Sequence, residues 1–290
     1  MGILRHTKLP YLLTDEQCVR LWYRLTFRRK LNLDNPQTFN EKLQWLKLYN
    51  RKPEYTTMVD KYAVKEYIAN LIGEEYVIPT LGIWDTPSKI EWNKLPERYV
   101  LKTTHGGGGK GVIVVKDGNQ LQHDIQRQKS IIATLNREMK RDTYKMLGEW
   151  PYKDVPRRII AEQYLEDSNG ELVDYKFSCF GGKAYKVMLC LNRASGNTKF
   201  YSFDRNWNLL RHNRMGKAAP ANFTLPKPAA MDEMFTIAET LSKGKPFVRV
   251  DLYYVQGHIY FGEMTFYPMS GLDANILPDI DRLYGSFVKL

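Results

Sequence analysis

The stretch VRVDLYYVQGHIYFGEMTF, residues 248–266, carries the strongest information on the fold of this chain. β-branched and aromatic residues alternate with polar ones on both sides of Gln256-Gly257, a pattern that predicts two antiparallel strands joined by a tight turn. Because side chains alternate between the two faces of a strand, Arg249 and Asp251 share one face. The residues predicted for the opposite, apolar face are Val248, Val250, Leu252, Met264 and Phe266.

The pairing of the two strands depends on the length of the loop that joins them. A two-residue turn at Gln256-Gly257 would pair Asp251 with Gly262 and would mix polar and apolar residues on both faces. A three-residue loop that includes His258 pairs Asp251 with Glu263 instead, and it leaves one face wholly apolar. We therefore predict the longer loop.

In that pairing, Arg249 faces Thr265 and lies beside two acidic side chains. Directly opposite residues have Cβ atoms about 5 Å apart. Asp251 and Glu263 therefore repel at neutral pH unless a cation bridges them or one of them takes up a proton. Oxygen ligands beside an arginine are what a magnesium–phosphate site needs. The alternative is a salt-bridged sheet edge in which Arg249 neutralises Asp251.

Residues 99–115, YVLKTTHGGGGKGVIVV, predict a strand, a glycine loop and a second strand. Successive glycines expose backbone N–H groups to phosphate oxygens without a Cβ in the way. The loop is not a dinucleotide-binding fingerprint, because a strand follows it, nor a Walker A loop, because Gly111 follows Lys110. The protein-kinase motifs H-R-D and D-F-G are absent from the sequence. We expect a flexible glycine lid over phosphates, with Lys102 on the entering strand; a plain hairpin tip is the alternative.

The other segments predict a mixture of helices and strands. Thr38 and Glu41 form a capping-box pattern at the start of an amphipathic helix. Strands and helices do not alternate strictly, so we predict an α+β class rather than a doubly wound sheet. Further helices are predicted over residues 15–29, 60–72, 120–147 and 231–244, and further strands over 157–165, 173–180, 183–191 and 199–204.

Two of these segments carry distinctive residues. The predicted helix over residues 120–147 is basic and amphipathic. Glu162 ends an apolar strand, but from the residues alone a solvated strand edge explains this position better. The apolar face of the basic helix is predicted to contain Ile125, Ile132, Leu135 and Met139, and one face of the strand after Glu162 to contain Asp174, Lys176 and Ser178.

The composition narrows the class of protein. Among 290 residues, 43 Lys and Arg exceed 32 Asp and Glu, and the net charge of +11 favours an anionic partner or serves solubility alone. No stretch approaches the roughly 18 apolar residues of a membrane-spanning helix, and we find no secretory signal. Three cysteines at no metal-like spacing indicate a reducing compartment. We expect a soluble, cytoplasmic protein.

The order of these motifs resembles the ATP-grasp superfamily of carboxylate–amine and carboxylate–thiol ligases. It is most similar to the branch named for teichuronopeptide biosynthesis, among polysaccharide-synthesis proteins. The resemblance runs from about residue 35 to the C-terminus, and its most specific pieces are VRVDLY…GEMTFYPMSG and DYKFSCFGG. It implies an α+β ATP-grasp fold, in which two α+β subdomains grip ATP, preceded by a helical N-terminal region. The implied boundaries are 1–57 for the helical region, 58–98 for a pre-ATP subdomain, 99–165 for the lid subdomain and 166–290 for the C-terminal subdomain with the metal site.

The resemblance also implies roles for individual residues of the predicted hairpin and its neighbour. Arg249 corresponds to the arginine that faces the transferred phosphoryl group, and Lys176 is a second candidate catalytic residue. Asp251 and Glu263 correspond to magnesium ligands. Thr265, which stands where the superfamily usually has Asn, is the third candidate ligand.

Further residues are implied for substrates. Ser270 and Gly271 are candidate contacts to the substrate, and Glu162 corresponds to the residue that accepts a hydrogen bond from the adenine amino group. Lys61 and Lys102 correspond to the two lysines that hold the nucleotide phosphates. The complete set implied for nucleotide binding is Lys61, Lys102, Gly106, Gly107, Gly108, Gly109, Lys110, Glu162, Gln163, Tyr164 and Leu165.

The implied reaction uses ATP and Mg²⁺ to convert a carboxylate into an acylphosphate, which an amine then attacks. We expect an amide between a uronic-acid-type carboxylate of a surface polysaccharide precursor and an amino acid or other amine. An acidic glycan suits the positive charge; no nucleic acid and no membrane span is expected, and association with a membrane surface stays open.

Three alternatives to a ligase remain. A sugar kinase could use the same residues and would differ only in its product. A glycosyltransferase needs an Asp-x-Asp motif after a Rossmann-like strand, whereas Asp279-Ile280-Asp281 follows the last predicted strand. A nucleic-acid-binding module would explain the charge and the tyrosines but not the glycine lid or the acidic pair.

Overall fold

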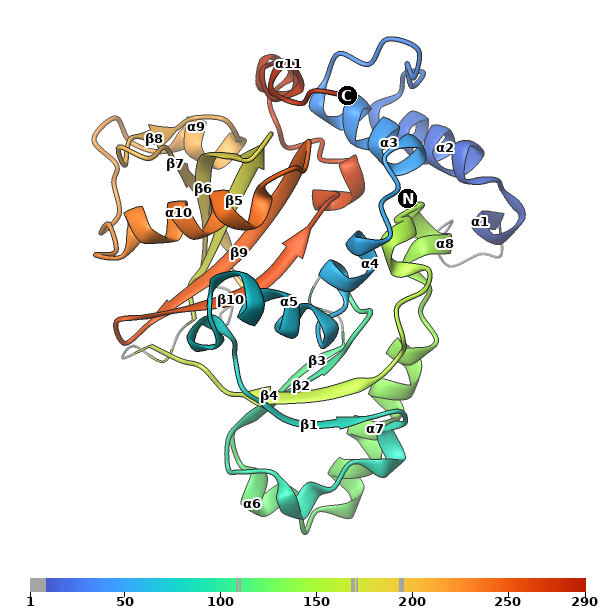
Figure 1. Cartoon of the computed structure of the whole chain (residues 1–290), viewed down its shortest axis with the longest axis vertical. Helices are drawn as coiled ribbons and strands as arrows, with labels where there is room; N and C mark the ends of the chain where they lie inside the picture. Colours follow the sequence, from blue (N-terminus) through green and yellow to red (C-terminus); the bar gives the residue numbers. More distant parts are fainter. Residues whose placement is uncertain (1–8, 108, 110, 168–169, 171, 193–195) are drawn as a thin grey trace. The chain divides into compact units, whose positions relative to one another are not determined.

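The computed structural model describes residues 9–107, 109, 111–167, 170, 172–192 and 196–290. The chain divides into two compact units, each built on its own antiparallel sheet (Figure 1). Unit 1 comprises Met1–Lys52, Lys145–Glu149 and Glu166–Leu290, and unit 2 comprises Pro53–Tyr144 and Trp150–Leu165.

The sheet of unit 1 contains the 248–266 hairpin. Its strands are β5 Asp174–Phe180, β6 Lys183–Leu191, β7 Lys199–Phe203, β8 Leu209–Leu210, β9 Phe247–Val255 and β10 His258–Thr265. In the described part of the unit these form a six-stranded antiparallel sheet in the order β10-β9-β5-β6-β7-β8. The hairpin therefore forms one edge of the sheet, and β5 lies directly beside it.

One face of this sheet is apolar, and a helix covers it. The helix α10, Met231–Ser242, packs against β9, β5 and β6 (Figure 1). The rings of Phe235 and Phe177 pack edge to face, with 5.0 Å between their centroids. The Sγ of Cys179 lies 3.7 Å from the carbonyl oxygen of Ala238. Val250 on β9 is fully buried on this face. Burial of such side chains contributes about 1.5–3 kcal/mol each, and the alternation along each strand leaves polar residues on the opposite face.

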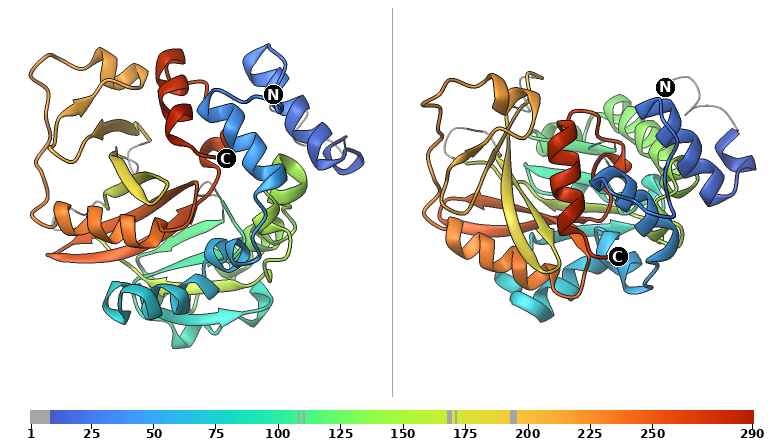
Figure 2. Two further views of the ribbon diagram at one scale, coloured as in Figure 1. Left: turned by 45° about the horizontal axis from the view of Figure 1, so that its top comes forward. Right: turned by 90° about the horizontal axis from the view of Figure 1, so that it is seen from above.

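Two helices of unit 1 lie side by side near one end of the sheet (Figure 2). They are α3, Phe39–Tyr49, and α11, Pro278–Phe287. The predicted capping box is confirmed, since the side chains of Thr38 and Glu41 each bond the other's backbone N–H. A Cβ at Gly285 would lie 2.1 Å from the carbonyl oxygen of Gln37, so only glycine allows α11 to come this close to the start of α3.

Unit 2 is built on the predicted strand–glycine–strand segment. Its strands are β1 Thr80–Trp84, β2 Tyr99–Thr103, β3 Val112–Val115 and β4 Ile159–Gln163, in the order β1-β4-β2-β3. β2 and β3 pair antiparallel on the two sides of the glycine segment, as predicted. The helix α7, Ile125–Met139, covers a core that includes Leu101, Leu121, Leu135 and Ile159.

Two predicted helices are interrupted in the structure. Within residues 60–72, the helix α5 begins only at Ala63, because the carboxylate of Asp60 accepts hydrogen bonds from the backbone N–H groups of the next turn. The single helix predicted over 120–147 is wrong. The chain forms α6 Gly118–Leu121, α7 and α8 Thr143–Leu147, and Asp124 caps the start of α7.

The predicted apolar face of the basic helix is also partly wrong. Ile125 is 56% exposed because it is the first residue of α7, and Ile131 rather than Ile132 is buried. Leu135 is buried as predicted, together with Gln128. The buried face of α7 therefore agrees with the prediction at Leu135 and Met139, which packs against the core, and differs from it in the first two turns.

The turn of the β9–β10 hairpin is shorter than predicted. His258 pairs with Val255, so Gln256-Gly257 forms a two-residue turn in which both residues have positive φ angles, 52° and 83°. The predicted pairing of Asp251 with Glu263 is nevertheless confirmed, because a β-bulge shifts the register between Phe261 and Glu263.

The bulge is built on a glycine. A Cβ at Gly262 would lie 3.0 Å from the carbonyl oxygen of Asp251 and equally close to the ring of Tyr253. The extra residue also turns Phe261 to the apolar face, opposite Leu252, whereas the longer loop would have placed it with Glu263.

The other described elements are short or lie at the N-terminus. The helix α2, Asp15–Phe27, starts at a capping box between Thr14 and Gln17 and buries Trp22. None of the helices within the described residues is both long enough and apolar enough to cross a membrane. The remaining bounds are α1 Leu9–Leu12, α4 Glu54–Val59, α9 Arg214–Ala218, η2 Glu74–Tyr76, η3 Pro87–Lys89, η4 Trp92–Lys94, η5 Trp150–Tyr152 and η6 Pro268–Gly271.

Candidate active site

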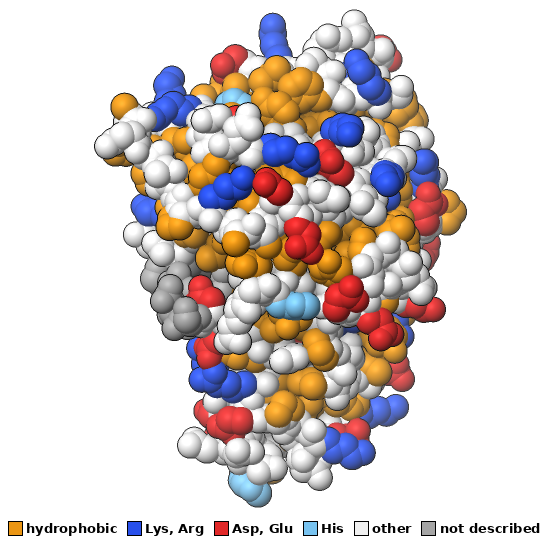
Figure 3. Space-filling model, turned by 60° about the vertical axis from the view of Figure 1, so that its left-hand side comes forward, with side chains coloured by type: hydrophobic (Ala, Val, Ile, Leu, Met, Phe, Trp, Pro, Cys, Tyr) orange, Lys and Arg blue, Asp and Glu red, His pale blue; other side chains and the backbone are white. Residues whose placement is uncertain are grey.

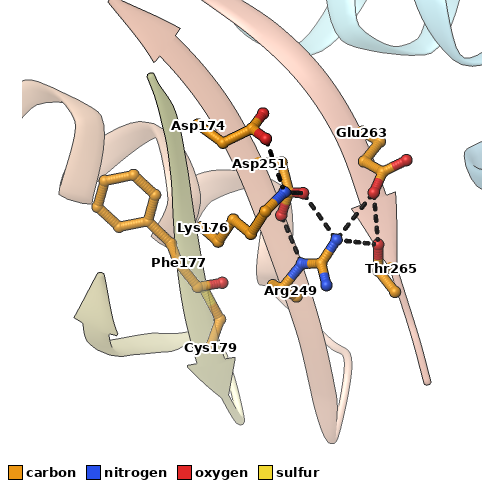
Figure 4. A network of polar contacts seen from close by, with 8 residues as sticks. All are labelled: Asp174, Lys176, Phe177, Cys179, Arg249, Asp251, Glu263 and Thr265. Atoms are coloured by element: carbon orange, nitrogen blue, oxygen red, sulfur yellow. Dashed lines mark hydrogen bonds and ion pairs between the residues drawn. The ribbon is translucent and has the colours of Figure 1, made fainter. Parts of the chain in front are cut away.

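The acidic pair of unit 1 lies on the sheet face opposite α10, and an arginine bridges it (Figure 4). Arg249 donates from Nε to Oδ1 of Asp251 at 2.6 Å and from Nη2 to Oδ2 at 2.7 Å. The same Nη2 donates to Oε1 of Glu263 at 2.8 Å and to the hydroxyl of Thr265 at 3.0 Å. Both carboxylates therefore point to the same side of the hairpin and share one guanidinium group.

A second cation reaches the pair from the neighbouring strand. The Nζ of Lys176 on β5 bonds Oδ2 of Asp251 and lies 3.5 Å from Oδ2 of Asp174. In Figure 4, Phe177, the next residue, points away from this cluster, as the alternation of β5 requires. The resemblance implied a role for Lys176, and the structure brings this residue into contact with Asp251 of the pair.

The burial of the two acids differs greatly. Asp251 is only 1% exposed, whereas the side chain of Glu263 is 37% exposed. Burial raises the pKa of Asp251, although Arg249 and Lys176 oppose that change. Burial alone would lower the pKa of Arg249, but the negative charges of Asp251 and Glu263 raise it. The guanidinium group is thus held in its charged form between two carboxylates.

The donor set suits a hard cation, but its arrangement here is that of an ion-pair network. Carboxylate and hydroxyl oxygens are the ligands that Mg²⁺ prefers, and Asp251, Glu263 and Thr265 supply them. No group of three or more His, Cys, Asp or Glu side chains within the described residues is arranged to hold a metal ion. A magnesium ion would share these oxygens with Arg249, and Glu263 is the more exposed of the two acids.

A left-handed loop follows β10 and contains the two candidate substrate contacts. Met269, Ser270 and Gly271 have φ angles of 49°, 58° and 61°, a conformation that costs about 1–3 kcal/mol per non-glycine residue. Lys47 of α3 donates to the carbonyl and the hydroxyl oxygen of Ser270, both at 2.8 Å. Gln44 donates to the carbonyl oxygens of Ser270 at 3.0 Å and Gly271 at 2.7 Å. The helix α3 thus fixes the shape of this loop.

In unit 2, three charged side chains form a second cluster. Glu162 on β4 accepts from Lys65 of α5 at 2.7 Å through Oε1 and from Lys102 of β2 through Oε2. Burial would raise the pKa of Glu162, but the two ammonium groups lower it. Lys65 also donates to the carbonyl oxygen of Ile78 at 2.6 Å. The predicted phosphate lysine Lys102 is therefore held by the residue predicted to contact adenine.

The glycine segment lies beside the other predicted phosphate lysine. The Nζ of Lys61 donates to the carbonyl oxygen of Gly106. Gly109 has a positive φ of 73°, and a Cβ at Gly107 or Gly109 would meet nothing within 4 Å. These two positions are therefore open to an approaching ligand. Two other predicted residues of the segment, Gly108 and Lys110, lie outside the described residues.

The end of β4 presents an aromatic ring between two cations. Lys116 lies 5.0 Å and Arg98 5.6 Å from the ring centroid of Tyr164. Gln163 is exposed, and Leu165 is buried. The predicted Gln163–Leu165 segment, which directly follows Glu162 in the sequence, thus lies at one end of the unit 2 sheet.

Comparison with protein families identifies the chain. The family model described as TupA-like ATPgrasp matches residues 41–289, most of the sequence. The chain belongs to the TupA-like ATP-grasp family. Its α+β ATP-grasp fold agrees with the architecture described above. No curated protein matches the chain.

Solved structures similar to this member of the TupA-like ATP-grasp family are distant in sequence. The D-alanine–D-alanine ligase from Bacillus anthracis, complexed with ATP, is 14% identical, with 80% of this chain and 62% of that chain covered and a TM-score of 0.45. The D-alanyl-alanine synthetase A from Vibrio cholerae O1 biovar eltor str. N16961 is 14% identical, with coverages of 86% and 72% and a TM-score of 0.47. The RimK domain protein ATP-grasp from Sphaerobacter thermophilus DSM 20745 is 13% identical, with coverages of 82% and 70% and a TM-score of 0.44. The chain spans less than two thirds of the length of the Bacillus anthracis ligase.

Three polar residues near these clusters escaped the sequence analysis. Lys65 lies one helical turn after Lys61, and that i, i+4 spacing was the only signal for it. Lys47 was counted as part of an amphipathic helix, yet it is 1% exposed and holds the loop at Ser270. Glu149 is buried, and burial raises its pKa; Lys47 and a hydrogen bond with Ser270 lower it. No local pattern indicated Glu149.

The net positive charge is not gathered in one patch on the face shown in Figure 3. Lys and Arg side chains alternate there with acidic and apolar ones. The sequence charge of +11 therefore does not define a single-sign binding surface on that face.

Proposed function

We propose that this chain is an ATP-dependent carboxylate–amine ligase that joins the carboxylate of a sugar acid, within a polysaccharide precursor, to an amino acid or another amine. The observation that carries the proposal is the convergence of Arg249, Lys176, Asp251 and Glu263 on one sheet face of a TupA-like ATP-grasp protein. Such a group of fixed charges is suited to phosphoryl transfer, in which catalysis consists mainly of positioning and charge neutralisation.

The chemistry divides between the two units. In unit 2, Lys61, Lys102 and the open glycine positions bind the phosphates of ATP through ammonium and backbone N–H groups. The Gln163–Leu165 segment and Glu162 recognise the adenine, because a carboxylate oxygen bonded to one lysine keeps a second lone pair for the amino group. Glu162 also holds Lys102 and Lys65 in place before the nucleotide arrives.

In unit 1, the acidic pair supplies carboxylate oxygens of the kind that magnesium prefers. Asp251, Glu263 and the hydroxyl of Thr265 would hold the ion, which would neutralise phosphate charge and orient the γ-phosphoryl group. Arg249, which lies between the two acids, would face the phosphoryl group that is transferred. Arg249 and Lys176 favour the ionised form of the buried carboxylate of Asp251.

The reaction then proceeds in two steps on the substrate. A carboxylate oxygen of the sugar acid attacks the γ-phosphorus, and ADP leaves, which gives an acylphosphate. The amine attacks the acyl carbon, phosphate departs with the electron pair of the C–O bond, and the amine loses a proton. The loop at Ser270 and Gly271 contacts the substrate, and the glycine segment excludes water that would hydrolyse the intermediate.

A single-turnover experiment tests this proposal. The protein is mixed with Mg-ATP, a hexuronate and a panel of amino acids, and ADP and amide are measured. The ligase proposal expects ADP and amide in equal amounts. A phosphomonoester in place of the amide would indicate a sugar kinase, and the absence of ADP with every pair would refute the proposal.

A further inference from the structure

A lysine of unit 1 that the proposed reaction does not use lies on the same sheet face as the acidic pair. Lys186 on β6 pairs with Ser178 on β5, and Ser178 pairs with Arg249 on β9. Paired residues on adjacent strands point to the same face. Because neighbouring strands lie about 4.8 Å apart, the Cα atoms of Lys186 and Arg249 are separated by about 10 Å.

Among the residues that the structure describes, Lys186 has few polar partners. Its Nζ is 3.4 Å from the hydroxyl of Ser202 and 4.9 Å from the ring centroid of Tyr284. No carboxylate of a described residue lies within the 4.0 Å of an ion pair. Asp273 acts on Lys186 only from farther away, and burial lowers the pKa of Lys186 to about 8. The imidazole of His212, which bonds the hydroxyl of Tyr284 at 2.8 Å, adds no negative charge.

Three other lysines of the chain, in either unit, show what Lys186 lacks. Lys176 lies against Asp251, Lys65 is 2.7 Å from Glu162, and Lys47 donates to oxygens at 2.8 Å. Lys186 is half-buried, and an ammonium group partly removed from water gains from such oxygens, because part of its hydration is otherwise lost without compensation. One hydroxyl at 3.4 Å does not supply them, since it is at the limit of a hydrogen bond.

We propose that Lys186 binds an anionic group, a carboxylate or a phosphate, that the sugar-acid substrate carries in addition to the carboxylate that is activated beside Arg249. This inference rests on the proposed function and narrows its substrate to a compound with at least two negative charges. The hydroxyls of Ser178 and Ser202, one on each neighbouring strand, supply further hydrogen bonds to the same anion.

Binding measurements without turnover test this assignment. Calorimetric titrations compare a dimeric hexuronate, a hexuronate 1-phosphate and a monomeric hexuronate, each in the presence of Mg-ADP. The wild-type protein is expected to bind both dianions more tightly than the monomer. Lys186→Met is expected to weaken the binding of dianions at least tenfold, as loss of a charge-assisted hydrogen bond requires, and to leave the monomer unchanged. Lys186→Arg is expected to retain most of the affinity.

A matched control lies on the same strand. Lys183 is exposed at the start of β6, and Lys183→Met is expected to leave all three affinities unchanged. Lysines carrying ¹³C-methyl groups are followed by NMR in a pH titration. The signal of Lys186 is the one that disappears in Lys186→Met. It is expected to titrate at higher pH once a dianion is bound.

The outcomes separate the inference from the proposed function. Tighter binding of only one dianion identifies the second group as carboxylate or phosphate. Equal affinity of the wild type and Lys186→Met for both dianions, or no preference of the wild type for them, overturns the assignment. Either result leaves the ligase proposal intact when Mg-ADP still binds and ADP is still formed from Mg-ATP. Loss of nucleotide binding in the wild type would instead refute the ligase proposal.

Discussion

Replacement of Asp251 by Asn removes the charge on which the unit 1 cluster depends while keeping the shape of the side chain. Asp251 is 1% exposed and bonds both Arg249 and Lys176. Breaking a buried ion pair costs about 3–5 kcal/mol when one charge stays behind unpaired. Because Arg249 keeps Glu263 and Lys176 keeps Asp174 as second partners, we expect a loss near the lower limit, about 3 kcal/mol.

We expect Asp251→Asn to slow the reaction more than its loss of stability alone would. Removal of one preorganised charge from a site of phosphoryl transfer lowers the rate by about 10²–10³-fold. Asp251→Asn also removes a magnesium ligand of the proposed site. We therefore expect ADP formation to fall about 10³-fold under conditions in which the variant is still fully folded.

The control variant is Asp174→Asn. Asp174 lies 3.5 Å from Lys176 and is not a proposed metal ligand. We expect it to lose about 1 kcal/mol of unfolding free energy and less than tenfold in ADP formation. Urea unfolding and single-turnover ADP formation are measured for both variants. If Asp251→Asn formed ADP at the wild-type rate, the assignment of the acidic pair to phosphoryl transfer would be refuted.

Further predictions concern the bulge, the left-handed loop and the unit 2 cluster. Gly262→Val is expected to destabilise the protein by about 1–3 kcal/mol in urea unfolding, since its Cβ would meet the carbonyl oxygen of Asp251 at 3.0 Å; an unchanged unfolding midpoint would contradict the bulge. Gly271→Ala places a Cβ 2.5 Å from Nε2 of Gln44 at a φ of +61° and is expected to cost about 1–3 kcal/mol, with weaker sugar-acid binding. If Gly271→Ala kept both the stability and the sugar-acid affinity of the wild type, the loop would have another shape. The lowered pKa of Glu162 means that its stabilising charge is complete above its unfolded pKa of about 4.3 and is lost as the pH falls through the lower folded value. Urea midpoints measured from pH 6 to pH 3 are therefore expected to fall less steeply for Glu162→Gln, and parallel curves would contradict the Lys65–Glu162–Lys102 cluster.

The hairpin shows how a correct pairing can be predicted for an incorrect reason. The polar alternation of Arg249 and Asp251 was enough to place Glu263 opposite Asp251, because only that pairing keeps the core face apolar. The sequence analysis placed the necessary offset in the turn, whereas the structure has it in a bulge at Gly262. A signal was present in the sequence, since the two apolar residues Phe261 and Met264 are separated by two residues instead of one, and both are buried in the structure.

Interactions between distant segments could not be predicted from local patterns. Glu162 was identified at the end of its strand, but the approach of Lys65 depends on how α5 packs in unit 2. Lys47 and Ser270 are 223 residues apart, and only the folded chain brings them together. Helix periodicity predicts that a lysine such as Lys47 faces solvent, because a buried ammonium group is rare unless several oxygens surround it.

Helix boundaries failed where side chains compete with the backbone. Asp60 and Asp124 accept hydrogen bonds from backbone N–H groups near the start of the following helix, and this ends a continuous helical pattern. Both residues are common caps, so the sequence contained the information. The apolar periodicity on either side was strong enough to outweigh it in the prediction.

The transfer of the γ-phosphoryl group of ATP to a substrate carboxylate is tested most directly with oxygen-18. A hexuronate labelled with oxygen-18 in its carboxylate is incubated with the protein, Mg-ATP and an amine, and the inorganic phosphate is analysed by mass spectrometry. The acylphosphate route predicts one labelled oxygen in each phosphate released for every amide formed. Release of unlabelled phosphate together with amide formation would contradict it.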